Sequence, residues 1–406
     1  MKEYLSKDSE YLIQKLLDKN FFYLTSKSHP KIEKIKKIIF EDIKKSYTFT
    51  KKLLVYNPIK PIIKNNKPDT MIRSSYVPKE IRDEIYNAYK WQLIYNVKIN
   101  GKLLKIIFGR KNNSFNKIVY DKKVEHIITL VHFFLLYVKN DKIKNITLNL
   151  YLTNNKKMLP NNSLDILSPI NCNSALTYPC SKNVSIFLYR KEEWFKVLVH
   201  EIIHSFCLDF SVYQQHNIKN EISSIFPLNS DFLISETYAE FWASYINCSF
   251  ISYYHSDNIF SQYKSLFNIL YNFEKYFSFI QSVKILHRMN LKYKNLYNTN
   301  MKNEIKMMYK ENTNVFVYYI LKTLFFYFDI EFLLLCYNNN DNIIHFDKTI
   351  SNIQRIIGFI KNHYKNKVFL EKVSVFENLV ELYYNTNDEK SFLLKTNRMT
   401  VNEIII

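Results

Sequence analysis

The sequence predicts an α+β fold, with a small mixed sheet early in the chain and helices over most of the remainder. Between residues 93 and 190 the apolar residues run together or alternate in short segments, as is typical of strands. Beyond residue 211 nearly every long segment has the helical period instead. Asn100 and Gly101 separate two of the apolar runs and predict a tight hairpin, because both residues tolerate a positive φ.

Residues 1–75 are predicted to form a helical extension followed by a linker. After Pro30, the isoleucines at 32, 35, 39 and 43 share one face of a helix expected over 31–46. Four of the nine prolines then fall between residues 58 and 78, where no period is visible. We therefore expect this proline-rich stretch to connect the extension to the rest of the chain.

Residues 76–210 are predicted to form a mixed α/β half. The expected elements, in order, are a helix over 78–90, hairpin strands over 93–99 and 103–108, a helix over 124–138, a strand over 146–152, a polar loop over 154–183, a strand over 184–190 and a helix over 191–208. The alternation of Ile146, Leu148, Leu150 and Leu152 is the clearest strand signal among them.

Residues 211–406 are predicted to form a helical half. Helices are expected over 232–250, 260–289, 305–337, 350–362 and 368–384, with no internal repeat. The most apolar window, residues 318–337, is interrupted by Lys322, Asp329 and Glu331. These charges favour a buried amphipathic helix, so we expect no membrane span.

The composition excludes one class of nucleotide site and gives weak support to a nucleic-acid partner. Glycine occurs only at 101, 109 and 358, so the sequence contains neither a P-loop nor a Rossmann fingerprint. A net charge of +20 would attract nucleic acid or anionic membranes. The lysines are dispersed, however, and codon bias in an A/T-rich genome explains them better than a dedicated basic surface does.

The cysteines are predicted to be free thiols. The five of them stand at 172, 180, 207, 248 and 336, without a CxxC pair that would indicate a structural zinc site or a redox motif. Charged residues interrupt the segment 1–17, which therefore does not resemble a signal peptide. We expect an intracellular, cytoplasmic protein in a reducing compartment.

The run from His200 to His204 reads His-Glu-Ile-Ile-His and carries the clearest chemistry in the chain. Two histidines four residues apart lie on one face of a helix, where both imidazoles can bind a single Zn²⁺. Glu201 stands beside them and suits a general base that takes a proton from metal-bound water. The pattern alone also fits a pair of ordinary helix histidines, so a third ligand has to decide.

Glu236 is the predicted third ligand, because a catalytic zinc site needs three protein ligands and an open position. It lies on an apolar-flanked helix with Glu240 one turn later, and two buried carboxylates require partners. If Glu236 binds the zinc, Glu240 can accept the free N–H of one histidine. The alternative is a pair of exposed glutamates on an amphipathic helix.

The residues that follow the motif argue against the metzincin class. Cys207 and Phe210 stand where that pattern has a glycine and a third histidine. Asp209 lies one residue off the register of the aspartate variant of the same pattern. We keep it as a weak alternative ligand, better suited to a helix end or to a hydrogen bond behind the ligands.

In these residues the sequence resembles the gluzincin metallopeptidases, the thermolysin-like and neprilysin-like group. Their pattern is His-Glu-x-x-His followed by a helix with Glu-x-x-x-Asp or Glu. The resemblance implies that His200, His204 and Glu236 hold one Zn²⁺. It also implies base catalysis by Glu201 and a supporting role for Glu240. The spacing from His204 to Glu236 is longer than in the thermolysin type, which indicates an enlarged loop or a divergent branch.

The resemblance extends to the order of the elements, which looks like the zincin-like catalytic module. In that family an edge strand aligns the substrate backbone, a task that the resemblance assigns to Val184–Arg190. The family mechanism also uses an electrophilic donor for the oxyanion, usually from the C-terminal half. Candidates for this donor are His287, Tyr318 and Tyr319.

The expected function is therefore hydrolysis of a peptide or protein substrate by a zinc metallopeptidase, with endopeptidase and exopeptidase activity both open. One alternative is a catalytically inactive, basic binding or virion protein that retains the zincin fold. Another is a zinc hydrolase of a non-peptide substrate. The composition resembles that of proteins from giant DNA viruses and other A/T-rich genomes, and a viral protein would act in the host cytoplasm or the virion.

Overall fold

A computed structural model describes residues 5–17, 29–139, 142–162, 164–213, 215–386 and 391–404. Six strands form one mixed sheet in the order β1-β2-β3-β4-β6-β5. Their bounds are β1 (Ile62–Asn65), β2 (Trp91–Ile99), β3 (Lys102–Arg110), β4 (Asn145–Thr153), β5 (Ala175–Thr177) and β6 (Asn183–Arg190). The strands β3, β4 and β6 run parallel to one another, whereas β1, β2 and β5 pair antiparallel to their neighbours. The predicted α+β class is confirmed.

The predicted hairpin is present between β2 and β3. Asn100 and Gly101 form its turn with φ angles of 48° and 80°, which is the left-handed region that both residues tolerate. Gly109 near the end of β3 lies directly beneath the ring of Tyr151 on β4, where a Cβ atom would collide with the ring. The bare backbone of Gly109 therefore lets the aromatic side chain pack flat on the sheet.

Helices make up most of the remaining described chain. The longer ones are α1 (Lys7–Leu17), α2 (Pro30–Tyr56), α3 (Lys79–Ala88), α4 (Lys117–Leu135), α6 (Trp194–Ser205), α7 (Gln215–Ile225), α8 (Ile234–Tyr254), α9 (Phe260–Arg288), α12 (Asp329–Asn339), α13 (Ile350–His363) and α14 (Lys367–Asn385). The short ones are α5 (Pro169–Cys172), α10 (Lys302–Met308), α11 (Lys322–Tyr327) and α15 (Phe392–Lys395), with 3₁₀ turns at Thr70–Arg73, Tyr293–Tyr297 and Thr299–Met301 and a π-helical segment η4 (Phe316–Leu321).

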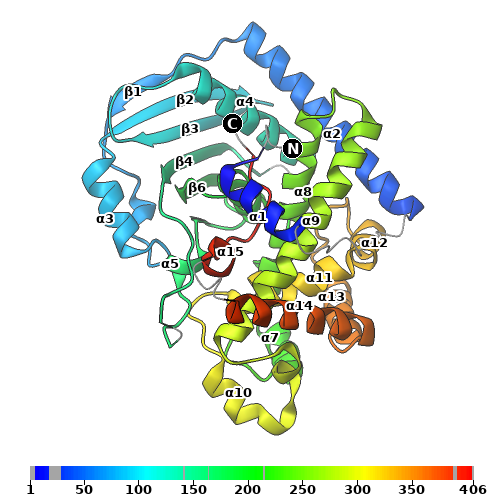
Figure 1. The fold of residues 1–406 in the computed structure, drawn as a ribbon. Coiled ribbons are helices and arrows are strands. Elements are labelled where there is room, and N and C mark those ends of the chain that lie inside the picture. The colour runs from blue at the N-terminus through cyan, green and yellow to red at the C-terminus, as the bar shows by residue number, and fades with distance from the viewer. Residues whose placement is uncertain are drawn as a thin grey trace.

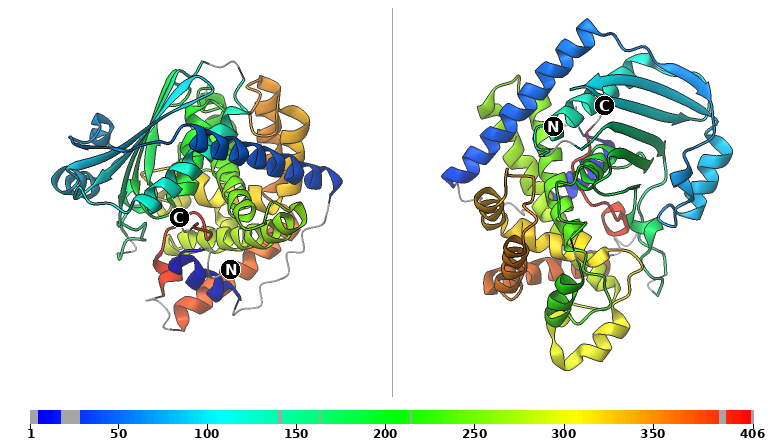
Figure 2. Two further views of the ribbon diagram at one scale, coloured as in Figure 1. Left: turned by 90° about the horizontal axis from the view of Figure 1, so that it is seen from above. Right: turned by 180° about the vertical axis from the view of Figure 1, so that it is seen from behind.

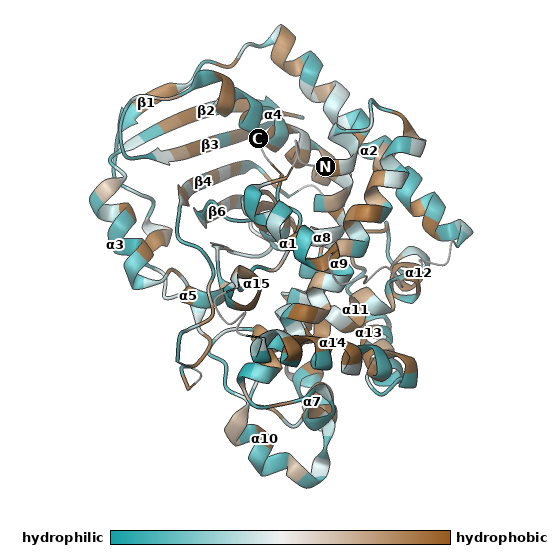
Figure 3. Cartoon of the chain, viewed as in Figure 1, coloured by the Kyte–Doolittle hydropathy of each residue, from teal (hydrophilic) through white to brown (hydrophobic). Residues whose placement is uncertain are grey.

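The sheet lies on one side of the molecule and the helical half on the other (Figures 1 and 2). Side chains alternate between the two faces of β6, so that Ile186 and Leu188 enter the main core while Phe187 and Tyr189 enter a second apolar cluster. The main core includes α4, α6, α8 and α9, and α2 packs across α4 and α8. Both hydrophobic and hydrophilic residues occur along the length of α2 (Figure 3), and the buried ones recur at helical spacing, as expected of an amphipathic helix.

The three predicted segments share packed cores. The main apolar cluster contains Ile39 from the first segment, Leu148 from the second and Tyr238 from the third. The stretch predicted as a linker contributes β1 to the sheet. The segment 71–89 packs on the sheet face that carries Phe187 and Tyr189. Ile72 is therefore buried, although no regular period marked this part of the sequence.

Two predicted elements differ from the structure. The polar loop over 154–183 contains β5, which pairs with the outer side of β6, so Val184–Arg190 is not the edge strand. The helix expected over 305–337 is divided into α10, η4, α11 and α12. Its first break contains Asn312, Thr313 and Asn314, which favour turns and caps over helix interiors because their side chains compete for backbone hydrogen bonds.

The prediction of five free thiols is wrong for one pair. Cys180, in the loop after β5, forms a disulfide with Cys207, just beyond α6, and their Cα atoms lie 4.5 Å apart. The chain brings them together because the β5–β6 hairpin packs against α6, a long-range contact that spacing could not show. Cys172, Cys248 and Cys336 are free and buried. Within the described ranges, no helix has the length and apolar character needed to cross a membrane.

Candidate metal centre

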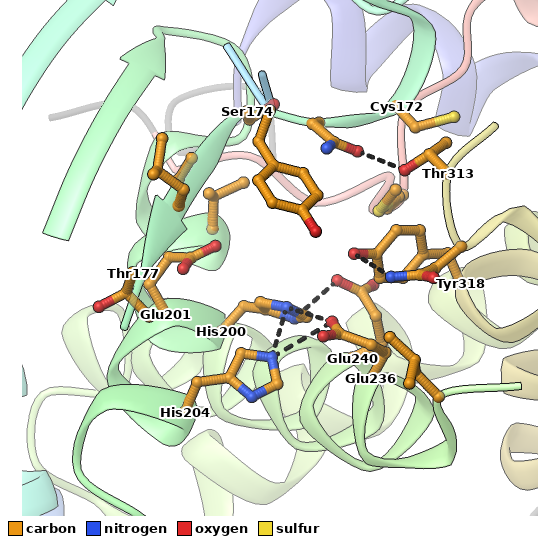
Figure 4. Close-up of a pocket in the computed structure, with 18 of the residues that line it drawn as sticks. Cys172, Ser174, Thr177, His200, Glu201, His204, Glu236, Glu240, Thr313 and Tyr318 are labelled. Carbon is orange, nitrogen blue, oxygen red and sulfur yellow. Dashed lines mark hydrogen bonds and ion pairs between the residues drawn. The ribbon is translucent and has the colours of Figure 1, made fainter. Parts of the chain in front are cut away.

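Helix α6 presents two imidazoles on one face. It begins after Glu193, whose φ of 58° turns the chain sharply out of β6 into the helix. Leu198 and Ile202 are fully buried in the main core and fix the opposite face of the helix. His200 and His204 stand one turn apart and point together toward α8 (Figure 4). The predicted arrangement of the motif on its helix is therefore present.

Three potential ligand atoms converge between α6 and α8. The Nε2 atoms of His200 and His204 lie 3.0 Å apart, and Oε2 of Glu236 lies 3.1 Å from the first and 3.2 Å from the second. Among the described residues, this is the one group of three histidine, cysteine or acidic side chains arranged to hold a metal ion. Glu236 is brought to the histidines because α8 packs along α6.

Two further carboxylates lie behind the histidines, each facing one Nδ1 atom. Asp209 is fully buried and accepts the Nδ1–H of His204 at 2.7 Å, and Oε1 of Glu240 lies 3.0 Å from Nδ1 of His200. An ionised carboxylate can only accept, so Nδ1 of His204 carries the proton of that imidazole. In the neutral form, Nε2 of His204 then presents its lone pair to Nε2 of His200 and to Glu236. A cation satisfies all three atoms, so these residues fit a metal ion.

The electrostatics of the cluster also favour positive charge. Burial opposes ionisation of Glu236, but the two imidazoles outweigh burial and hold the pKa of its carboxyl well below the usual range. Burial likewise opposes protonation of His204, yet Glu236 and Asp209 together raise the pKa of this imidazole well above its usual value. The carboxylates around the histidines thus create a local demand for a cation.

The carboxylate of Glu240 faces His200 and also forms ion pairs with two buried lysines. Lys196 forms an ion pair with one of its oxygens, and Nζ of Lys322 lies 3.0 Å from the other. Although burial opposes ionisation, the two lysines lower the pKa of Glu240 well below its usual value. Lys322 also donates to the backbone carbonyl of Met399 at 2.6 Å, which links the buried C-terminal segment to the cluster.

Glu201 is buried beside the two histidines and lines the same cavity. Burial raises the pKa of its carboxyl, while the nearby imidazoles act in the opposite direction. Figure 4 shows its carboxylate on the side of Thr177, apart from the three converging ligand atoms. Glu201 is therefore placed to act on a molecule in the cavity and leaves metal ligation to its neighbours.

A cavity of about 240 Å³ opens onto the cluster. One wall is the segment around β5, including Ser174 and Thr177, and the other is the segment from Thr313 to Tyr318 (Figure 4). The sheet edge and the helical half thus meet at the candidate metal centre. A molecule in this cavity would lie between the strand β5 and polar side chains such as Thr313 and Asn314.

The structure separates the three candidate oxyanion donors. Tyr318 lines the cavity, with its ring centroid 6.2 Å from that of His200. Tyr319 faces away and donates its hydroxyl proton to the carbonyl of Asn397 at 2.7 Å. His287 stacks on Tyr384 near the end of α9 and is not part of the cavity wall. The structure therefore brings only Tyr318 of these three to the cavity, and Tyr319 and His287 lie outside its wall.

Most residues of the cavity wall went unnoticed in the sequence, among them Tyr76 and Ser174. Tyr76 lies at the cavity with 58% of its surface exposed, and its backbone carbonyl accepts from the hydroxyl of Tyr189. Ser174 is 5% exposed, and its hydroxyl has no hydrogen-bond partner among the described residues. No sequence signal marks Tyr76 or Ser174, because the neighbouring strand β5 is only three residues long.

Comparisons with known protein families, with curated proteins and with solved structures give no match to this chain. The class that the fold and the site define is therefore a general one, an α+β protein with a group of side chains that could hold a metal ion.

Proposed function

We propose that this protein is a zinc-dependent hydrolase of the gluzincin type that cleaves peptide bonds. The observation that carries the proposal is the convergence of three ligand atoms, the Nε2 atoms of His200 and His204 and one oxygen of Glu236. Nδ1 of His204 is already committed to Asp209, and Nδ1 of His200 lies 3.0 Å from Glu240, so the inward-facing Nε2 atoms suit one cation. Two imidazoles and one carboxylate form a ligand set typical of catalytic zinc in peptidases.

A zinc ion at these residues would supply a Lewis acid that polarises a carbonyl group and acidifies water. The part assigned to Glu201 is to take a proton from the attacking water and to deliver it to the leaving amine. Its buried carboxyl, whose pKa is raised by burial, suits this exchange of protons. Tyr318 is assigned the donation of a hydrogen bond to the oxygen that becomes negative during attack.

The edge of the sheet supports a peptide as the substrate. The strand β5 ends the sheet, and Ala175–Thr177 line the cavity, so the task that the resemblance gave to Val184–Arg190 passes to β5. The outer side of an edge strand offers backbone N–H and C=O groups to an extended chain. The order of sheet, backing helix α4, metal helix α6 and helical half agrees with a zincin-like arrangement.

Metal analysis combined with a peptide-library digest tests the proposal. We expect the purified protein to contain about one zinc per chain and the variants His200→Ala and His204→Ala to lose it. Glu201→Gln should keep the zinc but lower kcat by about 10² to 10⁴-fold, because it removes the proton acceptor.

Glu331→Gln serves as the matched control, since this exposed glutamate pairs with His363 away from the cavity and should change neither property. Full activity of Glu201→Gln would contradict the role of this residue. A wild-type protein that binds zinc but cleaves no peptide would contradict the peptidase proposal.

A further inference from the structure

The cavity wall opposite β5 is an irregular segment, residues 309–315, that joins α10 to η4. It is fixed to the sheet side of the molecule at two places. The backbone N–H of Asn312 donates to the carbonyl of Leu167 at 2.8 Å, and the hydroxyl of Thr313 donates to the side-chain carbonyl of Asn173 at 3.0 Å. These bonds hold the segment in place along one side, but they do not reach the helix that follows it.

Glu311 makes the connection from this segment to η4. One oxygen of its carboxylate accepts the backbone N–H of Phe316 and the hydroxyl of Tyr309, each at 2.7 Å. A carboxylate at the start of a helical segment satisfies a free N–H group and interacts favourably with the positive end of the helix dipole. Burial raises the pKa of Glu311 to about 7, as expected for a side chain turned inward.

The start of η4 decides which tyrosine faces the cavity. Tyr318 and Tyr319 are adjacent in sequence, yet Tyr318 lines the cavity and Tyr319 donates to the carbonyl of Asn397 on the other side. A rotation of the segment by one residue would exchange their directions. The hydroxyl of Tyr318 receives a long bond of 3.5 Å from Asn314, which is too weak to fix it. Its direction therefore depends on the backbone of η4, which decides how the ring packs against the neighbouring cores.

We infer that Glu311 is a positioning residue that sets the direction of the Tyr318 hydroxyl by fixing the first turn of η4. The inference rests on the proposed function, in which Tyr318 donates to the oxyanion. π-helical turns are rare and are retained where they place a functional side chain. Here the carboxylate of Glu311 stabilises the beginning of such a turn, and Tyr318 is the side chain that the turn presents to the cavity.

A double-mutant cycle tests the inference. Glu311→Met keeps the length and burial of the side chain but removes the acceptor, whereas Glu311→Gln keeps an acceptor oxygen. We expect Tyr318→Phe to lower kcat by about 10²-fold and Glu311→Met by about tenfold, with KM nearly unchanged. The double variant should equal Tyr318→Phe alone, because the position of a missing hydroxyl no longer matters. Glu311→Gln should restore kcat to within about threefold of wild type.

Three further measurements complete the design. Zinc content should be unchanged in every variant, and Glu304→Gln on the exposed face of α10 is the matched control. If Glu311→Met does not fold, the shorter Glu311→Asp should give an intermediate loss of kcat. A crystal structure of the Glu311 variant should show the Tyr318 hydroxyl displaced by about 1 Å or more.

The outcomes separate the two proposals. Independent, multiplicative losses of kcat in the double variant, or an unmoved Tyr318 hydroxyl in the crystal, would overturn the role of Glu311. Absence of peptide hydrolysis by the wild-type protein would overturn the proposed function, while the displacement of Tyr318 in the crystal would still decide the role of Glu311.

Discussion

Asp209 should control the affinity of the candidate metal centre although it does not reach the metal. Its side chain is 0% exposed and accepts the Nδ1–H of His204 at 2.7 Å, while Ser211 donates to its other oxygen at 2.9 Å. Replacement by alanine removes a charge-assisted hydrogen bond worth about 2 kcal/mol. This corresponds to a Kd for zinc about 30-fold weaker, within the range found for residues that support metal ligands.

The expected cause is the tautomer of the imidazole. Without Asp209, the proton of His204 can move to Nε2, and the lone pair that faces Glu236 is then lost. Asp209→Asn keeps an oxygen that can accept the Nδ1–H, so its effect should be smaller, about fivefold. The order wild type, Asp209→Asn, Asp209→Ala in falling zinc affinity is therefore specific to this hydrogen bond.

Competition with a chromophoric chelator measures this affinity directly, and circular dichroism confirms that each variant is folded. Asp231→Ala is the matched control, because this exposed aspartate pairs with Lys219 and makes no contact with the histidines. A zinc Kd of Asp209→Ala within about twofold of the wild type would refute the reasoning.

Two further predictions concern stability. Replacing Cys180 and Cys207 by serine should lower the free energy of unfolding by about 3.5 kcal/mol for a sequence separation of 27 residues; urea titration measures this, and an unchanged midpoint would contradict it. Glu311→Gln addresses pH, because the folded pKa of Glu311 is raised from 4.5 to about 7. The free energy of unfolding of the wild type, measured relative to this variant, should therefore be highest below pH 4.5. This difference should fall by up to about 3 kcal/mol as the pH rises to 7, because the unfolded chain releases the proton of Glu311 more readily. A pH-independent difference between their unfolding curves would be the contrary result.

The elements with strong local signals were predictable from the sequence. The hairpin at Asn100 and Gly101 follows from the φ angles that these residues tolerate, and the structure has this turn. The helix that carries His200 and His204 follows from apolar periodicity, and a four-residue spacing places both side chains on one face. Such features depend on neighbouring residues, whose geometry is fixed by backbone hydrogen bonds within the element.

Features that depend on distant contacts were not predictable in the same way. The strand β5 is three residues long and lies in a polar, proline-containing loop, so its pairing with β6 had no periodic signal. The disulfide depends on that hairpin packing against α6. Among the candidate oxyanion donors, Tyr318 and Tyr319 are adjacent residues of the same type, and only their places along the backbone of η4 give them different directions.

The sequence by itself determined that two imidazoles share one helix face, because the helical period is a local property. Only the tertiary structure decided that Glu236 approaches both of them and that Asp209 turns back to hold His204. These contacts join residues on different turns and helices, and they form because the packing of α6 against α8 and the chain reversal after α6 bring the atoms together. Local propensity specifies the parts of the centre, and long-range burial specifies how they meet.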